Sequence, residues 1–210
     1  MTAEPLAFHR RVAQEKRAAI IEAATRLFLE RGYDGTSLAR VAETADVSKS
    51  TLFKQFPTKS ALFEAIVTTY WDLGEGMTAQ PAAGDLRAGL GAIGRQYAEL
   101  LDRPGMASLF RIVIAELPRF PELGRVQFRL GKMPYFESVQ RYLEAESAAG
   151  TASVDDSETA ANQFLGMISN YVLWPRMLLV DWNPGTVAIQ GAVDQAVVTM
   201  LARYSAATSN

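Results

Sequence analysis

The stretch TSLARVAETADVSKSTLFKQF, residues 36–56, contains two short helical patterns separated by a break of a few residues. In the first pattern, over residues 38–45, apolar residues recur at the spacing of one helical face. In the second, only Leu52 and Phe56 are placed to face inward, four residues apart, and the remaining positions are mostly polar. The stretch therefore predicts two short helices joined by a tight turn at residues 45–47, the second with a narrow, polar outer face.

Small polar residues and glycine mark the ends of these helices. Gly32 follows a predicted helix over residues 14–31 and supplies a left-handed stop. Thr36 or Ser37 can offer a hydroxyl to the free amide groups of the next helix, and Ser48 can do the same for the one after it. The sequence thus predicts three consecutive helices with defined caps.

Helical periodicity continues along the rest of the chain, which predicts an all-α fold of about nine helices. The further helices are expected over residues 59–73, 85–101, 106–117, 121–148, 157–180 and 184–206. Pro134 and Pro175 predict kinks or breaks. Asn183 is expected to cap the last helix, with Pro184 at its first position.

Composition shifts divide the chain into four parts. Residues 1–13 are expected to form a flexible arm, and residues 14–73 an N-terminal helical domain. The segment GEGMTAQPAAG, residues 74–84, is rich in glycine and small residues and is typical of a linker. Residues 85–206 then form a larger C-terminal helical domain.

Composition also excludes several kinds of site. The chain has no cysteine, and its one histidine, His9, lies in the predicted arm, which argues against zinc sites and Ser-His-Asp catalysis. The pair Asp155–Asp156 suits the start of a helix rather than catalysis. The apolar run at residues 164–180 is interrupted and shorter than the about 20 residues that span a bilayer. No secretory signal is recognisable, so a soluble cytoplasmic protein without a membrane partner is expected.

The outer face of the helix over residues 49–55 suits nucleic acid. Ser50 and Lys54 point directly away from Leu52 and Phe56, which leaves a slender surface rich in hydrogen-bond donors. Such a rod fits the major groove of DNA, which is roughly 12 Å wide. Residues 1–65 carry 10 Lys and Arg against 8 Asp and Glu, while the remainder carries 11 against 15, so a basic excess is local and small. A solvated surface helix is the alternative interpretation.

Residues 14–67 resemble the N-terminal DNA-binding domain of the TetR family of bacterial transcriptional regulators, through RLFLERGYDGTSLARVA and VSKSTLFKQFPTKSALF. The resemblance implies a helix-turn-helix over residues 37–56 and contacts to phosphates or bases. The implied DNA-binding residues are Thr36, Ser37, Ser48, Lys49, Ser50, Thr51, Phe53, Lys54, Gln55 and Lys59. The family usually has Tyr at the position of Phe53 and often His at that of Gln55, so the hydroxyl contact expected from Tyr is lost. The basic residues at 10, 11, 16 and 17 form either an arm in the minor groove or a solvated tail.

Pairing of two chains is expected, because helix-turn-helix proteins present two recognition helices about 34–36 Å apart. The helix over residues 157–180 is apolar on more than one side, and by resemblance the last two helices form a four-helix bundle in a homodimer. The expected interface residues are Phe164, Ile168, Val172, Val187, Gly191, Val198 and Leu201. A helix buried at the centre of a monomer is the alternative.

The C-terminal domain is also rich in aromatic residues and methionine. By resemblance it holds a small-molecule pocket, and residues 109–128 are similar to the AefR-like repressors. The expected pocket residues are Trp71, Phe110, Ile114, Met167, Tyr171 and Trp174. A lipophilic effector is expected, with Arg111, Glu116 or Arg176 orienting a polar end. No cofactor or metal is implied.

The leading hypothesis is therefore a ligand-responsive repressor that binds a palindromic operator in double-stranded DNA. The alternatives are an activator, or a regulator without a small ligand. A helical enzyme or carrier is a remote alternative that the lack of cysteine and the isolated His9 disfavour.

Overall fold

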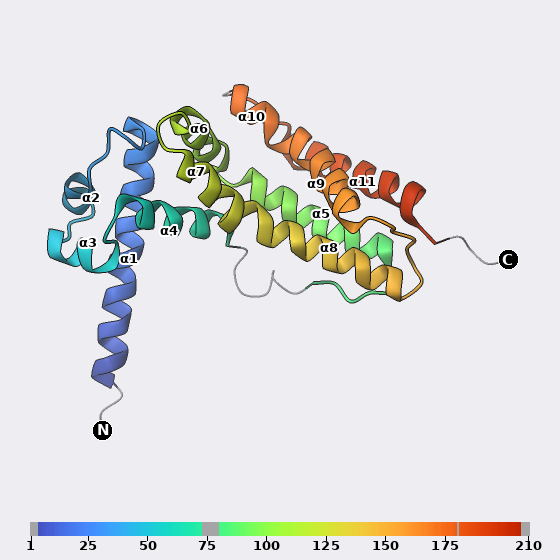
Figure 1. The fold of residues 1–210 in the computed structure, drawn as a ribbon, viewed down its shortest axis with the longest axis horizontal. Coiled ribbons are helices and arrows are strands. Elements are labelled where there is room, and N and C mark those ends of the chain that lie inside the picture. The colour runs from blue at the N-terminus through green and yellow to red at the C-terminus, as the bar shows by residue number, and fades with distance from the viewer. Residues whose placement is uncertain (1–3, 73–79, 180, 207–210) are drawn as a thin grey trace. The chain divides into compact units, whose positions relative to one another are not determined.

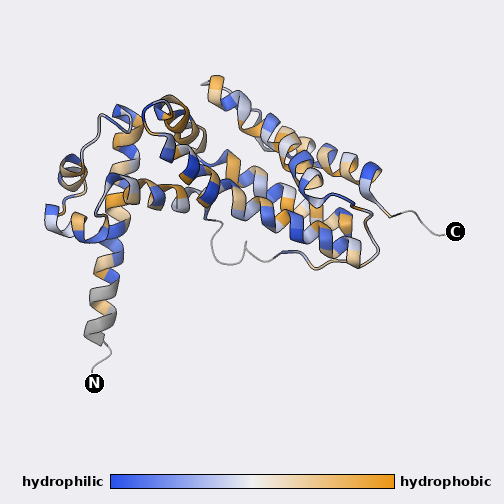
Figure 2. Cartoon of the chain, viewed as in Figure 1, coloured by the Kyte–Doolittle hydropathy of each residue, from blue (hydrophilic) through white to orange (hydrophobic). Residues whose placement is uncertain are grey.

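The computed structural model describes residues 4–72, 80–179 and 181–206, and all the regular elements in this part are helices. The order is α1 Glu4–Arg31, α2 Leu38–Thr44, α3 Lys49–Gln55, α4 Lys59–Trp71, α5 Leu86–Asp102, α6 Met106–Glu116, α7 Pro121–Val126, the π-helix η1 Gln127–Lys132, α8 Met133–Ala148, α9 Ser157–Val172, α10 Trp174–Leu178 and α11 Gly185–Tyr204. The predicted all-α class is confirmed. Hydrophilic and hydrophobic residues are interspersed along the long helices (Figure 2), as in helices that bury one face.

The chain divides into two compact units. Unit 1 contains the chain up to Tyr70 together with residues 111–130, and unit 2 contains residues 71–110 and the chain from Gly131 onward. The sequence assigned residues 85–206 to a single C-terminal domain. In the structure, residues 111–130 within that range belong to unit 1.

Unit 1 is built around α1. Helices α2, α3 and α4 surround α1 (Figure 1), and each contributes fully buried apolar side chains to a common core. These side chains include Ile20, Ala24 and Phe28 of α1, Val41 of α2, Leu52 of α3, Phe56 after it, and Leu62, Phe63 and Ile66 of α4. Two short helices can be stable here because packing of their inner faces, rather than helix propensity, holds them.

Residues 111–130 are tied to the loop between α1 and α2. The ring of Phe120 packs edge-on against that of Tyr33 with 5.1 Å between centroids. Arg119 forms an ion pair of 2.7 Å with Asp34, and the backbone amide of Asp34 donates to the carboxylate of Glu116 over 3.3 Å. These contacts place residues 111–130 in unit 1 and could not be anticipated from local sequence.

Unit 2 is a helical bundle in which α9 packs against α5, α8 and α11. Helix α5 lies close to α9 and α11 at Gly94, where an added Cβ would lie 2.7 Å from Val193 and 3.1 Å from Phe164. The fully buried Glu146 accepts hydrogen bonds from Tyr142, Thr151 and the backbone amide of Gly84. A buried carboxylate with three donors fixes the segment that leads into α5.

The predicted flexible arm is corrected. Residues 4–13 are helical and extend α1 by ten residues beyond the start predicted at residue 14. The segment EPLAFHRRVA contains mostly good helix formers, and Pro5 lies in the first turn, where its missing N–H is tolerated. Residues 1–3, and the side chains of His9 and Arg10, lie outside the described residues.

The effects of the prolines were largely as predicted. Pro134 lies just after η1, which divides the stretch predicted as one helix over residues 121–148. Pro175 lies in the first turn of α10, and the helix predicted over residues 157–180 is broken at Leu173. The cap predicted at Asn183 is wrong: Pro184 occupies the N-cap position without a side-chain hydrogen bond, and Gly185 has a φ of +77°.

The linker and the end of α4 are only partly described. α4 ends at Trp71, and Leu73 lies outside the described residues, as does most of the predicted linker at residues 74–84. Its described part, residues 80–84, is not helical, and Asp85 caps α5 by accepting from the backbone amide of Ala88 over 2.9 Å.

Candidate nucleic-acid interface

Local caps shape α2, the turn and α3. The hydroxyl of Ser37 accepts from the backbone amide of Arg40 over 3.2 Å, which begins α2. Asp46 has a φ of +51° in the turn. The hydroxyl of Ser48 then accepts from the backbone amide of Thr51 over 3.1 Å, which begins α3. The caps predicted at Ser37 and Ser48 are confirmed, and the turn between the helices is tight.

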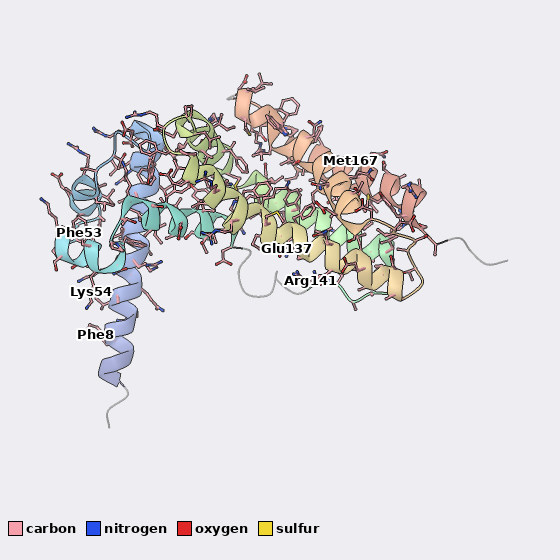
Figure 3. All side chains as sticks on the ribbon, viewed as in Figure 1. Phe8, Phe53, Lys54, Glu137, Arg141 and Met167 are labelled. Atoms are coloured by element: carbon pink, nitrogen blue, oxygen red, sulfur yellow. The ribbon has the colours of Figure 1, made fainter. Side chains whose placement is uncertain are left out.

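The inner face of α3 consists of Leu52, followed by Phe56 at the C-cap, and both side chains are fully buried. The outer face is open: Lys49, Ser50, Phe53 and Lys54 are exposed, while Thr51 and Gln55 are half-buried. Phe53 keeps 48% of its surface accessible. Figure 3 shows Phe53 and Lys54 extending from α3. The structure thus brings the residues predicted for α3 together on one accessible surface.

Two predicted DNA contacts are corrected. Thr36 is only 1% exposed, and its hydroxyl donates to the carbonyl groups of Leu27 and Gly32, so it cannot reach a phosphate. Lys59 donates to the carbonyl oxygens of Tyr33, Asp34 and Thr36 over 2.7, 3.3 and 3.0 Å. All three protons of its ammonium group are therefore committed to the loop before α2.

The surroundings of Lys59 support this structural role. Its ammonium nitrogen lies 4.5 Å from the centroid of the Tyr33 ring, a cation–π contact. Burial lowers the pKa of Lys59, and the nearby carboxylates of Asp34 and Glu116 oppose that change. Burial also raises the pKa of Tyr33, to about 12, with help from Glu122 and Glu116. The ammonium group of Lys59 therefore fixes the loop before α2 rather than facing outward.

Further cations lie near α3: Arg40 is not among the predicted DNA-binding residues, whereas Lys16 and Arg17 are among the basic residues expected to form an arm or a solvated tail. Arg40 is exposed on α2. It falls outside the apolar positions of that helix, and this was the signal in the sequence that it faces outward. Lys16 and Arg17 of α1 face α3 across a cleft of about 530 Å³ that Lys54 also lines. Gln55 closes one edge of the cleft by donating to the carbonyl of Ala13 over 3.4 Å.

The predicted dimer residues fall into two groups. Phe164, Ile168 and Val172 of α9 are fully buried within unit 2, because they face α5 and α11, so they are not available to a partner. On α11, Val187 is 86% and Val198 is 48% exposed. Leu201 is half-buried, and Gly191 faces open space, as Gly166 of α9 does.

The predicted pocket residues do not gather around one cavity. Trp71 lies beside Phe110, with 6.3 Å between ring centroids, whereas Tyr171 lies beside Trp182 at 6.1 Å. Ile114 belongs to unit 1 and is 51% exposed, Trp174 is 53% exposed, and Met167 is half-buried. Arg176 and Glu116, expected to orient a ligand, contact Asp102 and the amide of Asp34 instead.

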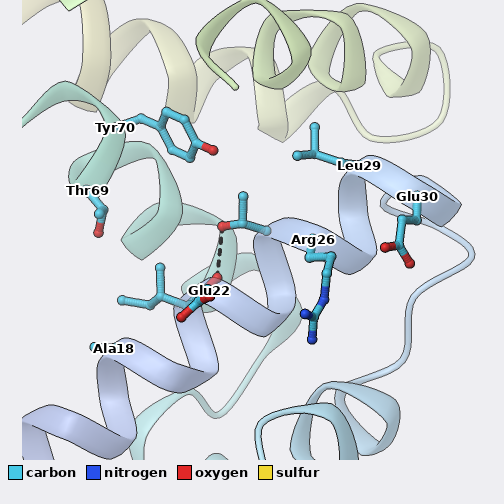
Figure 4. A pocket seen from close by; sticks show the side chains of 9 residues that line it. Ala18, Glu22, Arg26, Leu29, Glu30, Thr69 and Tyr70 are labelled. Carbon is cyan, nitrogen blue, oxygen red and sulfur yellow. Dashed lines mark hydrogen bonds between the residues drawn. The ribbon is translucent and has the colours of Figure 1, made fainter. Parts of the chain in front are cut away.

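One cavity lies in unit 1. Figure 4 shows this hollow of about 660 Å³ between α1 and α4. Its lining is mainly apolar, with Ile21, Leu29 and the ring of Tyr70, and the hydroxyl of Thr25 is already bonded to the carbonyl of Ile21. A smaller hollow of about 130 Å³ lies between α5 and α11 in unit 2. None of the six predicted pocket residues lines either hollow or the cleft beside α3.

Neither metal chemistry nor a membrane span emerges from the described residues. Within them, no group of three or more His, Asp or Glu side chains is arranged to hold a metal ion. None of the helices there is both long and apolar enough to cross a bilayer.

Comparison with known proteins agrees with this geometry. Residues 20–66 match the family described as "bacterial regulatory proteins, tetR family", and residues 88–206 match the "AefR-like transcriptional repressor, C-terminal domain". The second match alone spans more than half of the chain. The chain belongs to the TetR family. It is thus a DNA-binding transcriptional regulator, with α2 and α3 forming its helix-turn-helix.

Solved structures resemble the chain over most of its length. A protein from Mesorhizobium loti MAFF303099, assigned to the TetR family, is 27% identical. The match covers 92% of this chain and 98% of that protein, with a TM-score of 0.79. The flavonoid-responsive regulator FrrA is 29% identical, and the match covers 90% of this chain and 97% of FrrA, with a TM-score of 0.70.

A relative by sequence is YuxN of Bacillus subtilis, an uncharacterised HTH-type transcriptional regulator. It is 37% identical over 59 residues, which are 28% of this chain and 20% of YuxN. The chain thus spans about a fifth of the length of YuxN.

Proposed function

We propose that this TetR-family protein is a ligand-responsive repressor that acts in the cytoplasm and binds a palindromic operator as a homodimer. The observation that carries the proposal is the outer face of α3, where Lys49, Ser50, Phe53 and Lys54 are exposed above the buried Leu52. A rigid helix with accessible cations and hydroxyls can enter a major groove and hydrogen-bond to base edges.

Phosphate contacts belong to the residues around this face. Ser37 caps α2, Arg40 is exposed in its first turn, and Ser48 caps α3, and the backbone amides at helix N-termini favour phosphate groups. Thr51 and Gln55 flank the face. Phe53, without a hydroxyl, contributes apolar contact with sugar or a thymine methyl group.

Dimerisation is supported by the exposed apolar and small residues of α11. Val187 and Val198 lie open, and Gly191 of α11 and Gly166 of α9 leave room for a close neighbour. Because Phe164, Ile168 and Val172 belong to the core, the proposed interface uses the opposite faces of α9 and α11. Burying Val187 and Val198 in an interface would remove their apolar surface from water, which favours association.

Response to a lipophilic effector is supported by the likeness to FrrA, which is flavonoid-responsive. A route to the DNA-binding helices is available, because residues 111–130, part of the AefR-like region, contact Tyr33 and Asp34 just before α2. An effector that favours one arrangement of this segment shifts the population of DNA-competent dimers.

Selection from a random DNA library tests the proposal and identifies the operator in the same experiment. The full chain should enrich a two-fold symmetric sequence with half-sites about one helical turn apart or a multiple of it.

Further measurements test the other parts of the proposal. Light scattering of the complex should give an even number of protein chains. Flavonoids should be the first compounds screened for release of the protein from its operator. A reporter with the selected site over a promoter distinguishes repression from activation. Failure to enrich any sequence would refute the proposal.

A further inference from the structure

The N-terminal half of α1 forms one wall of a cleft in unit 1. α1 runs past α3 toward the N-terminus (Figure 1), and the cleft of about 530 Å³ lies between the two helices. Its α1 wall consists of Val12, Ala13, Gln14, Lys16 and Arg17, and its α3 wall of Ser50, Thr51, Lys54 and Gln55. Residues 12–17 precede the region that matches the TetR DNA-binding domain, which begins at residue 20.

The lining of this cleft is positive and rich in donors. Lys16, Arg17 and Lys54 line it, and no carboxylate is among its lining residues. Glu15, the acidic neighbour in sequence, is not in the lining and pairs with Arg11 at 3.6 Å. A concave surface with three cations and no acid attracts a polyanion.

The walls are held in place before any ligand binds. The guanidinium carbon of Arg17 lies 4.4 Å from the centroid of the buried Phe56 ring. The amide of Gln55 donates to the carbonyl of Ala13 over 3.4 Å. These two contacts join α1 to the C-terminal end of α3, whereas Lys16 and Lys54 remain exposed. Because the two helices are already joined, the backbone that carries Lys16 and Lys54 needs no further ordering when phosphate binds.

The position of the cleft indicates which part of the DNA it binds. Ser50, Thr51 and Lys54 belong both to the cleft and to α3, so the cleft is continuous with the face proposed to enter the major groove. When a helix lies in that groove, a phosphodiester strand borders it on each side. We propose that the cleft holds the sugar–phosphate strand flanking each half-site, with Lys16 and Lys54 neutralising its phosphates. The inference rests on the proposed function and adds a contact to it.

A consequence is a longer footprint. The N-terminal part of α1 carries Arg11 and Lys16, which precede residues 20–66, the part that matches the family model of the DNA-binding domain. A straight helix rather than a flexible arm then lies against the flanking strand. Binding should therefore depend on phosphates outside the bases that α3 reads.

The test compares Lys16→Ala with Arg26→Ala in the full chain. Both substitutions remove one exposed cation from α1, but Arg26 lines the other hollow, between α1 and α4. Affinity for the selected operator is measured by fluorescence anisotropy at several KCl concentrations. Lys16→Ala should flatten the salt slope by about one per protomer, Arg26→Ala should not, and Lys16→Arg should restore the slope.

A second duplex locates the contact. Replacing the phosphates just outside each half-site by neutral methylphosphonates should weaken the wild type and leave Lys16→Ala little affected. Equal slopes for Lys16→Ala and Arg26→Ala on the unmodified duplex would overturn the cleft assignment, even if Lys49→Ala weakens binding and the proposed function stands. A wild type that prefers no sequence would overturn both.

Discussion

The ammonium nitrogen of Lys59 lies 2.7 Å from the carbonyl oxygen of Tyr33 and 3.0 Å from that of Thr36, and it donates a hydrogen bond to each. The first residue of α4 thus fixes the loop that leads into α2. The resemblance to TetR proteins implied a phosphate contact for this lysine, whereas its surroundings make it a structural tie.

Lys59→Met should therefore destabilise unit 1. Methionine retains most of the stem but donates no hydrogen bond, so the partly buried carbonyl groups lose their partner. We expect the free energy of unfolding to fall by about 1–3 kcal/mol. Denaturant unfolding followed by circular dichroism measures it. Lys54→Met, at an exposed position, should change it by no more than about 0.5 kcal/mol. Equal midpoints for the two variants would contradict the assignment.

Gly94→Ala should destabilise unit 2. The added Cβ would lie 2.7 Å from Val193 and 3.1 Å from Phe164, so α5 and α11 must separate, at a cost of about 1–3 kcal/mol. The better helix propensity of alanine offsets up to about 1 kcal/mol of this.

Gly91→Ala on the same helix is the matched control for Gly94→Ala. The nearest atom to its new Cβ is the mobile end of Arg95, at 3.2 Å, which can move away. Thermal unfolding should rank the proteins with Gly94→Ala lowest and Gly91→Ala at or above the wild type. A Gly94→Ala protein as stable as the wild type would show that the packing is looser than described.

Short-range features of this fold could be predicted because their causes are local. Ser48 caps α3, Gly32 takes a φ of +77° after α1, and Pro175 marks the break between α9 and α10. Each depends on the geometry of a single turn. The inner positions of α3, Leu52 and Phe56, followed from helical periodicity alone.

Features that depend on distant residues could not be predicted. Asp34 and Glu116 are 82 residues apart in sequence, and no local pattern indicates that they meet. Periodicity also showed that Phe164 and Ile168 share an apolar face, but it could not say whether that face meets the chain's own core or a second copy. In the structure, α5 and α11 pack against α9 and bury this face in the chain's own core.

Val198→Lys should weaken dimerisation. Val198 is 48% exposed on the face of α11 proposed to meet a partner, and a symmetric interface would bring two buried lysines near its axis. Analytical ultracentrifugation should show a raised fraction of monomer. Ala145→Lys, at an exposed position on α8, provides the same added charge elsewhere and should leave the dimer intact. Identical sedimentation of the two variants would place the interface on another face.

Alkaline pH should destabilise unit 2 through Tyr97. Burial raises the pKa of Tyr97 to about 12, although a hydrogen bond with Ser169 acts in the opposite direction. The unfolded phenol ionises near pH 10, so the unfolded chain releases its proton first. Stability is therefore fully present below about pH 10 and is lost as the pH rises toward 12.

The Tyr97→Phe variant isolates this contribution. It has no phenol to ionise, so its midpoint of denaturant unfolding should fall less between pH 10 and 12 than that of the wild type. The stacked ring of Tyr135, 5.0 Å from that of Tyr97, remains in both proteins. Equal pH dependence in the two proteins would show that the Tyr97 phenol already titrates normally in the folded state.

The central claim is that the outer face of α3 meets DNA, and the salt dependence of operator binding in the Lys49→Ala/Lys54→Ala double variant tests it most directly. Both lysines are exposed, so the fold should be retained, as circular dichroism can verify. We predict a weaker complex whose salt slope is flatter by about two per protomer. An affinity and a slope equal to those of the wild type would contradict the assignment of α3 as the recognition helix.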